Sequence, residues 1–236
     1  SMTKHPSKDK EQLHDTPVAI LGSLKSHVDK VWNVFWSNGI ANPLSIVEHI
    51  SYLLFLRQLS MTDIAIPKKF SWATIVNEKD DQQLTEAIQS AFEYCQNDID
   101  IHAEHRLFAM YQEHMKHAVF AISNPIVLKK VVDIIEQIPL GSDTIGDLYE
   151  YMLHKISVSG QNGQFRTPRH IIEMMVQMVE PRPHDVICDP ACGSGGFLLF
   201  AAAYMSNKTS KNRYIGYDFD RGMLRIATMN MILHDI

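Results

Sequence analysis

One short stretch, Asp185–Phe197, carries the residue types most able to do chemistry; it reads D-V-I-C-D-P-A-C-G-S-G-G-F. A short apolar run ends there at the acid Asp189, and three glycines follow within four residues, ahead of a second apolar run. The pattern predicts a buried strand, a tight loop and a helix. In α/β proteins the crevice at the carboxyl end of such a strand binds ligands, and glycines let backbone N–H groups come close to a ligand. We therefore expect a ligand-binding loop, called the Gly loop below, over Asp189–Gly196.

The glycine spacing and the acid indicate which ligand this is. The dinucleotide pattern G-x-G-x-x-G fits at Gly193 and Gly195, but its third position falls on Leu198. Asp189 would repel a pyrophosphate and attract a cationic amine. A second acid, Asp218, ends the next predicted strand, where an acid commonly accepts hydrogen bonds from ribose hydroxyls. The two acids favour an adenosine ligand without phosphates, such as S-adenosylmethionine. The alternative is a plain strand–helix connection whose glycines only permit close packing.

The first half of the chain predicts a helical domain. Residues 1–17 are polar with mixed charge, and we expect them to form a mobile tail. From residue 18 onward, apolar residues recur at three- and four-residue spacing, which is typical of amphipathic helices. We therefore assign residues 18–140 to a helical N-terminal domain. Its helices are expected over Val18 to about Ile64 with a break at Asn42-Pro43, then over Trp72–Ile75, Asp80–Asn97, His105–Phe120 and Ile126–Ile138.

Residues 141–236 predict helices and strands that alternate around the Gly loop. Thr167 is expected to cap a helix whose first residue is Pro168, because proline suits that position. Strands are expected at Val186–Asp189 and Tyr214–Tyr217. The helices are expected over Asp143–Ile156, from Pro168 to about Glu180, from the Gly loop to about Met205, and over Arg221–Leu233.

Composition limits the classes of function. The 236 residues are 45% apolar with a net charge of −5, so bulk charge does not predict a nucleic-acid binder, and DNA contact would need a local basic patch or a basic partner. Three sparse cysteines argue against a disulfide framework and for a reducing cytoplasm. We find no signal peptide and no apolar run approaching the ~20 residues of a membrane span, so we expect a cytoplasmic location.

Metal binding is the less favoured interpretation of the histidines and cysteines. The pairs His102/His105 and His114/His117, placed on one continuous helix, would lie about 18 Å apart along its axis, which is too far for one shared ion. Solvated helix faces are the favoured alternative. Cys192 is expected to be a small packing residue. We therefore expect no metal site.

Four segments carry a resemblance to a known family. They are G-D-L-Y-E-Y-M-L (Gly146–Leu153), G-Q-F-R-T-P-R (Gly163–Arg169), D-P-A-C-G-S-G-G-F-L (Asp189–Leu198) and G-Y-D (Gly216–Asp218). In this order and spacing they resemble the modification subunit of type I restriction–modification systems, an adenine-specific DNA methyltransferase. The resemblance implies an α/β fold, in which a helical N-terminal domain precedes a Rossmann-like S-adenosylmethionine-dependent methyltransferase domain. Only two of that domain's seven strands are evident, so residues 141–236 are expected to form a partial domain with an incomplete sheet.

The resemblance also implies the cofactor contacts. One segment would lie over the methionine and sulfonium end of S-adenosylmethionine, the Gly loop would surround the methionine side, and Asp218 would bind the ribose hydroxyls. Arg166 departs from the family, in which an aromatic residue usually occupies its place, and its charge is expected to weaken packing beside a sulfonium. The implied segment comprises Gln164, Phe165, Arg166, Thr167, Pro168 and Arg169, and the implied loop residues are Asp189, Gly193, Ser194, Gly195 and Gly196.

The family's catalytic motif, N/D-P-P-F/Y, does not occur among these residues, so no catalytic residue is assigned, and we expect the chain alone not to methylate DNA. The two Asn-Pro pairs, Asn42-Pro43 and Asn124-Pro125, do not continue as the motif requires. The resemblance implies a specificity subunit, a restriction subunit, a second modification subunit and duplex DNA as partners. The alternatives are a non-catalytic fragment that binds cofactor or helps assembly, and part of a stand-alone adenine methyltransferase.

Overall fold

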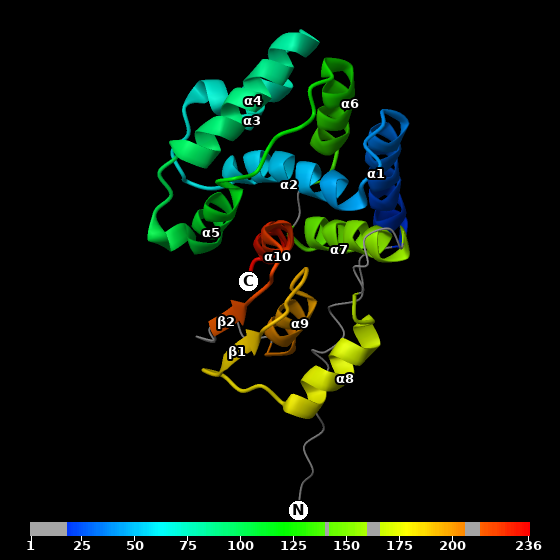
Figure 1. The fold of residues 1–236 in the computed structure, drawn as a ribbon, viewed down its shortest axis with the longest axis vertical. Helices are drawn as coiled ribbons and strands as arrows, with labels where there is room; N and C mark the ends of the chain where they lie inside the picture. The colour runs from blue at the N-terminus through cyan, green and yellow to red at the C-terminus, as the bar shows by residue number, and fades with distance from the viewer. Residues whose placement is uncertain (1–17, 140–141, 160–165, 206–212) are drawn as a thin grey trace, which may run out of the picture.

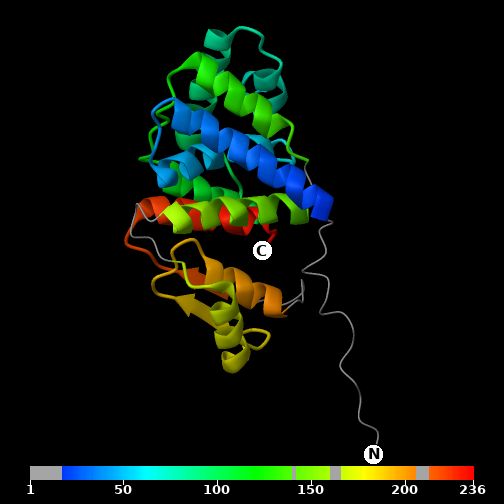
Figure 2. The ribbon, with the colours of Figure 1, turned by 90° about the vertical axis from the view of Figure 1, so that its right-hand side faces the viewer.

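The computed structural model describes residues 18–139, 142–159, 166–205 and 213–236 (Figure 1). A layer of helices lies above a small α/β part, and α7 and α10 run between the two (Figures 1 and 2). The elements are, in order, α1 (Val18–Ser37), α2 (Pro43–Leu59), η2 (Lys68–Phe70), α3 (Trp72–Val76), α4 (Asp81–Asn97), η3 (Ala103–His105), α5 (Arg106–Met115), α6 (Pro125–Glu136), α7 (Ser142–Ser159), α8 (Arg169–Val179), β1 (Val186–Asp189), α9 (Gly196–Met205), β2 (Arg213–Gly216) and α10 (Arg221–Leu233).

The two Asn-Pro pairs of the sequence start helices. Asn42 precedes α2, and its side-chain oxygen accepts a hydrogen bond from the Leu44 N–H at 3.0 Å. Asn124 precedes α6 in the same way and accepts from the Ile126 N–H at 3.0 Å. An asparagine cap followed by proline is a strong start signal, because the cap satisfies a free N–H and proline lacks one. These pairs are therefore explained by helix geometry.

Helix α2 is the centre of the helical layer. Its side chains are apolar on nearly every side, and most of its residues are buried between the surrounding helices. Arg57 near its end is only 5% exposed. Its guanidinium donates to the carbonyl oxygens of Ile135 and, at 2.8 Å, of Ile138, which lie at the end of α6 and just beyond it. The buried cation thus satisfies carbonyl groups that a helix end leaves without partners.

The main hydrophobic core runs through the helical layer and into α7 and α10. Tyr149 and Met152 on α7 belong to it, as do Ile226 and Met229 on α10, and each of these side chains is at most 1% exposed. Whether residues 18–140 and 141–236 fold as two separate domains stays a prediction. In the folded chain, the helices on either side of residue 140 share one core.

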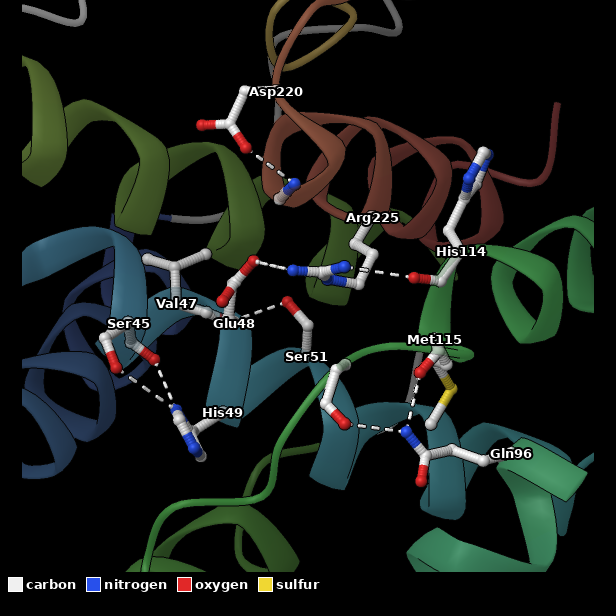
Figure 3. Close-up of polar contacts among 12 residues, drawn as sticks. Ser45, Val47, Glu48, His49, Ser51, Gln96, His114, Met115, Asp220 and Arg225 are labelled. Carbon is white, nitrogen blue, oxygen red and sulfur yellow. Dashed lines mark hydrogen bonds and ion pairs between the residues drawn. The ribbon is translucent and has the colours of Figure 1, made fainter.

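A partly buried ion pair also joins α2 to α10 (Figure 3). The Arg225 guanidinium lies 2.9 Å from Glu48 Oε1 and donates to the His114 carbonyl oxygen at 3.0 Å. A Cβ on Gly222 would lie 2.6 Å from the same Glu48 oxygen, so the missing side chain gives the carboxylate its space. Arg225 therefore connects three helices at a point where the C-terminal helix enters the helical layer.

The small α/β part contains two parallel strands. β1 pairs with β2 in the register Val186↔Arg213 to Asp189↔Gly216. α9 packs against both strands, and α8 packs against α9. The mostly helical chain with a small parallel sheet agrees with the predicted fold class, and both strands lie within a residue of their expected bounds. The predicted burial of β1 was wrong: its residues alternate between exposed and half-buried, because β2 is its one partner among the described residues.

The predicted helix over His105–Phe120 was too long. The α-helix covers Arg106–Met115 only, and a short 3₁₀ turn precedes it. The Gln96 amide, from α4, donates to the carbonyl oxygens of Met115 at 2.6 Å and Ala118 at 2.8 Å, so these groups are satisfied without further helix (Figure 3). Over the part of the chain that the structure describes, no helix is long and apolar enough to cross a bilayer.

Candidate functional site

The Gly loop connects β1 to α9, as predicted, and two of its glycines have left-handed backbone. The φ angles are +52° at Gly193 and +83° at Gly195, which disfavour any residue with a Cβ. A Cβ on Gly195 would also lie 2.7 Å from the Met231 methyl group of α10. Gly195 is therefore needed for close packing against α10 as well as for the loop conformation. The alternative that the glycines only permit close packing thus explains part of the glycine pattern.

The two predicted acids lie at one edge of the sheet and both bind the backbone. Asp189 Oδ1 accepts from the Ala191 N–H at 3.0 Å. Asp218 Oδ2 accepts from the Gly193 N–H at 2.9 Å, and its Oδ1 accepts from the Asp220 N–H at 2.8 Å. An ionised carboxylate offers about four acceptor positions. Asp218 therefore holds the Gly loop and keeps acceptor capacity for further donors.

The N–H groups of the Gly loop are largely engaged within the protein. Besides those of Ala191 and Gly193, the Cys192 N–H donates to the Tyr217 carbonyl oxygen and the Gly195 N–H to the Cys192 carbonyl oxygen, each at 2.8 Å. A phosphate bound in such a loop needs these donors. The loop therefore presents carboxylates rather than free N–H groups, which agrees with the prediction against a dinucleotide.

Cys192 packs beneath the loop, as the sequence predicts. It is 7% exposed, and a Cβ on Gly216 would lie 3.0 Å from its sulfur. Burial raises the pKa of the Cys192 thiol to about 11, and the charges of Asp218 and Asp189 add to the effect. A thiol that stays protonated at neutral pH is neither a good nucleophile nor a good metal ligand.

Ser194 contacts a residue that sequence reasoning missed, and Gly196 lies near Arg166, which was predicted. Ser194 is 6% exposed, and its carbonyl oxygen accepts from the Asn230 side-chain amide of α10 at 3.0 Å. A Cβ on Gly196 would lie 3.8 Å from an Arg166 nitrogen. Asn230 is fully buried, and no local spacing pattern marks it as different from a solvent-facing helix residue.

Arg166 pairs with a carboxylate on α7. Its Nη2 lies 2.8 Å from Glu150 Oε2 on α7. Burial alone would raise the pKa of Glu150, but the Arg166 charge and the hydrogen bonds from Arg166 and Asn230 outweigh it, so the pKa is lowered. Glu150 was within the segment G-D-L-Y-E-Y-M-L that carries the resemblance, which is the signal that could have identified it.

The rest of the segment predicted to lie over the cofactor is only partly described. Gln164 and Phe165 lie outside the described residues. Thr167, Pro168 and Arg169 are exposed, at the start of α8. The predicted cap was wrong by one position, because α8 begins at Arg169, Pro168 occupies the capping position, and no side chain makes a cap hydrogen bond. The Thr167 hydroxyl is therefore not used as a cap.

Two aromatic side chains flank Asp218 and were not predicted as site residues. Tyr217 is 60% exposed, and Phe219 is fully exposed. Exposed aromatic side chains of this size favour contact with a flat apolar ligand group or a further protein segment. Tyr217 follows β2 directly and Phe219 comes two residues later, so their position just after a strand was the signal that could have identified them.

One group of possible metal ligands occurs within the described ranges, and it includes none of the Gly loop residues. It consists of Asp63, Glu104 and His105, whose ligand atoms lie within 4.8 Å of one another. His105 Nε2 lies 2.6 Å from Asp63 Oδ1, and the Asp63 side chain is 82% exposed. His105 is therefore accounted for by a hydrogen bond to a surface carboxylate. The two H-x-x-H pairs do not share one helix, because α5 covers only Arg106–Met115.

Comparison with known proteins gives matches in both parts of the chain. A family model described as "N-6 DNA Methylase" matches residues 140–236, and one described as "HsdM N-terminal domain" matches residues 24–65. The type I restriction enzyme StySPI methylase subunit of Salmonella potsdam is 34% identical over 110 residues, which cover 40% of this chain and 21% of that protein. The type I restriction enzyme EcoKI methylase subunit of Escherichia coli K12 matches with the same identity and coverage. The chain thus spans about a fifth of the length of these relatives.

A solved structure resembles nearly the whole chain. It is described as the structural basis of complex assembly and conformational transition of the type I R-M system. The TM-score is 0.71 at 20% identity, over 93% of this chain and 49% of that chain. At this identity the likeness concerns the fold, and it confirms the predicted order of a helical part followed by a methyltransferase-like α/β part.

Proposed function

We propose that this chain, which belongs to the family of modification subunits of type I restriction–modification systems, supplies the cofactor-binding part of a site-specific DNA adenine-N6 methyltransferase. Membership of a methyltransferase family implies a methyl donor. We assign that donor as S-adenosylmethionine, because its charges match the Gly loop. The full activity is a proposal for the whole protein, of which this chain is one part.

The observation that carries the proposal is the pair of carboxylates at the Gly loop. Asp189 and Asp218 occupy backbone N–H groups that a phosphate would need, and they make the edge of the sheet negative. S-adenosylmethionine carries an ammonium and a sulfonium and no phosphate. The donor set therefore fits this cofactor better than a dinucleotide.

Each part of the site has a proposed role. Asp218 accepts from the ribose hydroxyls with the acceptor positions that its two backbone bonds leave open. Phe219 contributes its exposed ring to the adenine face. The Gly loop, with Asp189, Gly193, Ser194, Gly195 and Gly196, surrounds the methionine part, and the segment Gln164–Arg169 lies over it. When bound, the cofactor supplies a methyl group made electrophilic by the positive sulfur, and these residues bind and orient it.

Calorimetry with S-adenosylmethionine tests the cofactor assignment. The wild-type chain is expected to bind, and Asp218→Ala is expected to weaken binding by about tenfold or more, because about one charge-assisted hydrogen bond is lost and the loop loses an anchor. Asp133→Asn is the matched control, since Asp133 lies on α6 and pairs with Lys129 on the surface. Absence of binding by the wild-type chain would favour the alternative of an assembly fragment without cofactor.

Methyl transfer and complex formation test the larger assignment. The 236 residues of the chain contain no N/D-P-P-F/Y segment, so the isolated chain is expected not to transfer a tritiated methyl group to unmodified DNA. Robust incorporation would contradict this. We propose a specificity subunit, a restriction subunit, a second modification subunit and duplex DNA as partners of the whole protein. Co-purification of that protein with a specificity subunit separates the type I assignment from a stand-alone methyltransferase.

A further inference from the structure

Polar side chains from α7, from α10 and from the segment before α8 form hydrogen bonds next to the Gly loop. The Glu150 carboxylate accepts from Arg166 Nη2 at 2.8 Å through Oε2, and from Asn230 Nδ2 at 2.9 Å through Oε1. The same Asn230 nitrogen donates to the Ser194 carbonyl oxygen at 3.0 Å. An amide nitrogen has two hydrogens, so both of its bonds can be made at once. One carboxylate and one amide therefore link the Arg166 segment to the Gly loop.

The linkage holds its parts in a defined orientation. Asn230 is fully buried, and its two donated bonds fix which way the amide points. Glu150 lies on α7, whose neighbours Tyr149 and Met152 are buried in the main core. The carboxylate is therefore presented from a helix that packs into the main core, and the Arg166 side chain reaches it from the start of the next described segment.

The charge of Arg166 requires an explanation. Its Nη2 would lie 3.8 Å from a Cβ on Gly196, the first residue of α9, and a helix N-terminus disfavours a nearby cation. A positive sulfonium in the Gly loop would be disfavoured by the same guanidinium. The lowered pKa of Glu150 agrees with a carboxylate that stays ionised and offsets this charge.

We infer that Glu150 is a positioning residue for the methyl donor: together with Asn230 it anchors Arg166 against the Gly loop and neutralises the guanidinium, so that a cationic cofactor is accepted beside it. This inference rests on the proposed binding of S-adenosylmethionine at the Gly loop. It also accounts for the arginine at a position where the family resemblance leads us to expect an aromatic residue.

The test compares a cationic and a neutral form of the same ligand. S-adenosylmethionine carries the sulfonium, and S-adenosylhomocysteine has a neutral thioether in its place. Glu150→Gln keeps an oxygen that can accept from Asn230 but loses the charge that faces Arg166. The variant is expected to weaken binding of S-adenosylmethionine about tenfold and of S-adenosylhomocysteine about threefold or less, because only the former meets the exposed cation.

Two further variants separate charge from structure. In the double variant Glu150→Gln/Arg166→Gln, the ratio of the affinities for S-adenosylmethionine and S-adenosylhomocysteine should return to the wild-type value, because the guanidinium charge is gone. Arg166→Gln alone covers the case in which Glu150→Gln does not fold, because the Arg166 side chain is 24% exposed and lies outside the core. This variant should not lower the ratio of the affinity for S-adenosylmethionine to the affinity for S-adenosylhomocysteine. Glu86→Gln, an exposed change on α4, controls for net charge. An equal loss for both ligands in Glu150→Gln would overturn the neutralising role.

Limited trypsin digestion without ligand keeps the anchoring role testable by itself. Cleavage after Arg166 and Arg169 should be several-fold faster in Glu150→Gln than in the wild-type chain and in Glu86→Gln, because the ion pair no longer holds the segment. Equal rates would overturn the anchor. If the wild-type chain binds neither ligand, the proposed function and the neutralising role both fail, and the digestion still decides the anchoring.

Discussion

The Glu48–Arg225 ion pair offers the most direct test of how α10 is held in the helical layer. Arg225 Nη2 lies 2.9 Å from Glu48 Oε1, and Arg225 Nε lies 3.3 Å from the same oxygen. The Arg225 side chain is 13% exposed and the Glu48 side chain is 20% exposed. Burial alone would lower the pKa of Arg225, but the Glu48 charge outweighs it and the pKa is raised. The perturbation is Arg225→Met, which keeps most of the volume and removes the charge.

The expected cost follows from what is left behind. Removing one partner of a buried ion pair costs about 3–5 kcal/mol, because the other charge stays buried without compensation. The His114 carbonyl oxygen also loses its donor. Since Glu48 keeps some solvent contact, we expect the lower end, about 3 kcal/mol in the free energy of unfolding. Adding Glu48→Gln should recover roughly 1–2 kcal/mol, because no unpaired charge then remains.

Urea unfolding followed by circular dichroism measures these values. Lys129→Met is the matched control, because Lys129 pairs with Asp133 on the surface of one helix and should cost no more than about 0.5 kcal/mol. A cost below about 1 kcal/mol for Arg225→Met, together with additivity in the double variant, would refute the reasoning. The number of transitions is informative too, since two separate transitions would support the predicted division at residue 140.

Three further predictions concern the core and the Gly loop. Tyr111→Phe should leave stability unchanged or raise it by up to about 1 kcal/mol, because the buried hydroxyl finds no hydrogen-bond partner among the residues described. Gly195→Ala should destabilise the chain by roughly 1–3 kcal/mol, measured by urea unfolding, because of its positive φ and the Met231 contact. Burial lowers the pKa of His49, whose Nε2 accepts a backbone N–H, so stability should fall as pH decreases below about 6.5 toward the folded-state pKa, because the unfolded state then binds the proton more readily.

Each of these predictions has a control that reverses or removes the effect. Tyr149→Phe should cost about 1 kcal/mol, because its hydroxyl bonds Ser51 Oγ at 2.7 Å. A gain of stability there would contradict the Tyr111 argument. Gly22→Ala, at an exposed position in α1 with no atom near its Cβ, should be neutral or stabilising. His49→Gln should show a shallower loss of stability between pH 7 and pH 5, and an unchanged slope would contradict the assignment of that loss to His49.

Local chemistry in the sequence was enough to predict most of the elements. Asn-Pro pairs mark helix starts at Asn42 and Asn124 wherever the chain folds, because cap and proline geometry are local. The run that ends at Asp189, with glycines at 193 and 195, likewise requires a strand, a loop with left-handed backbone and a helix. The helix that was predicted too long ended at Met115, because Gln96 from another helix took its last carbonyl group.

By itself, the sequence predicted the Gly loop and its two acids, because these depend on residues within about thirty positions of one another, and the class of ligand that they suit stays a prediction. Only the tertiary structure decided which polar helix residues pair with one another behind the loop and between the helices. Glu150 and Asn230 are 80 residues apart and Glu48 and Arg225 are 177 apart, so no spacing rule joins them. On a helix, a buried polar residue and a solvent-facing one look alike in the sequence, and packing alone distinguishes them.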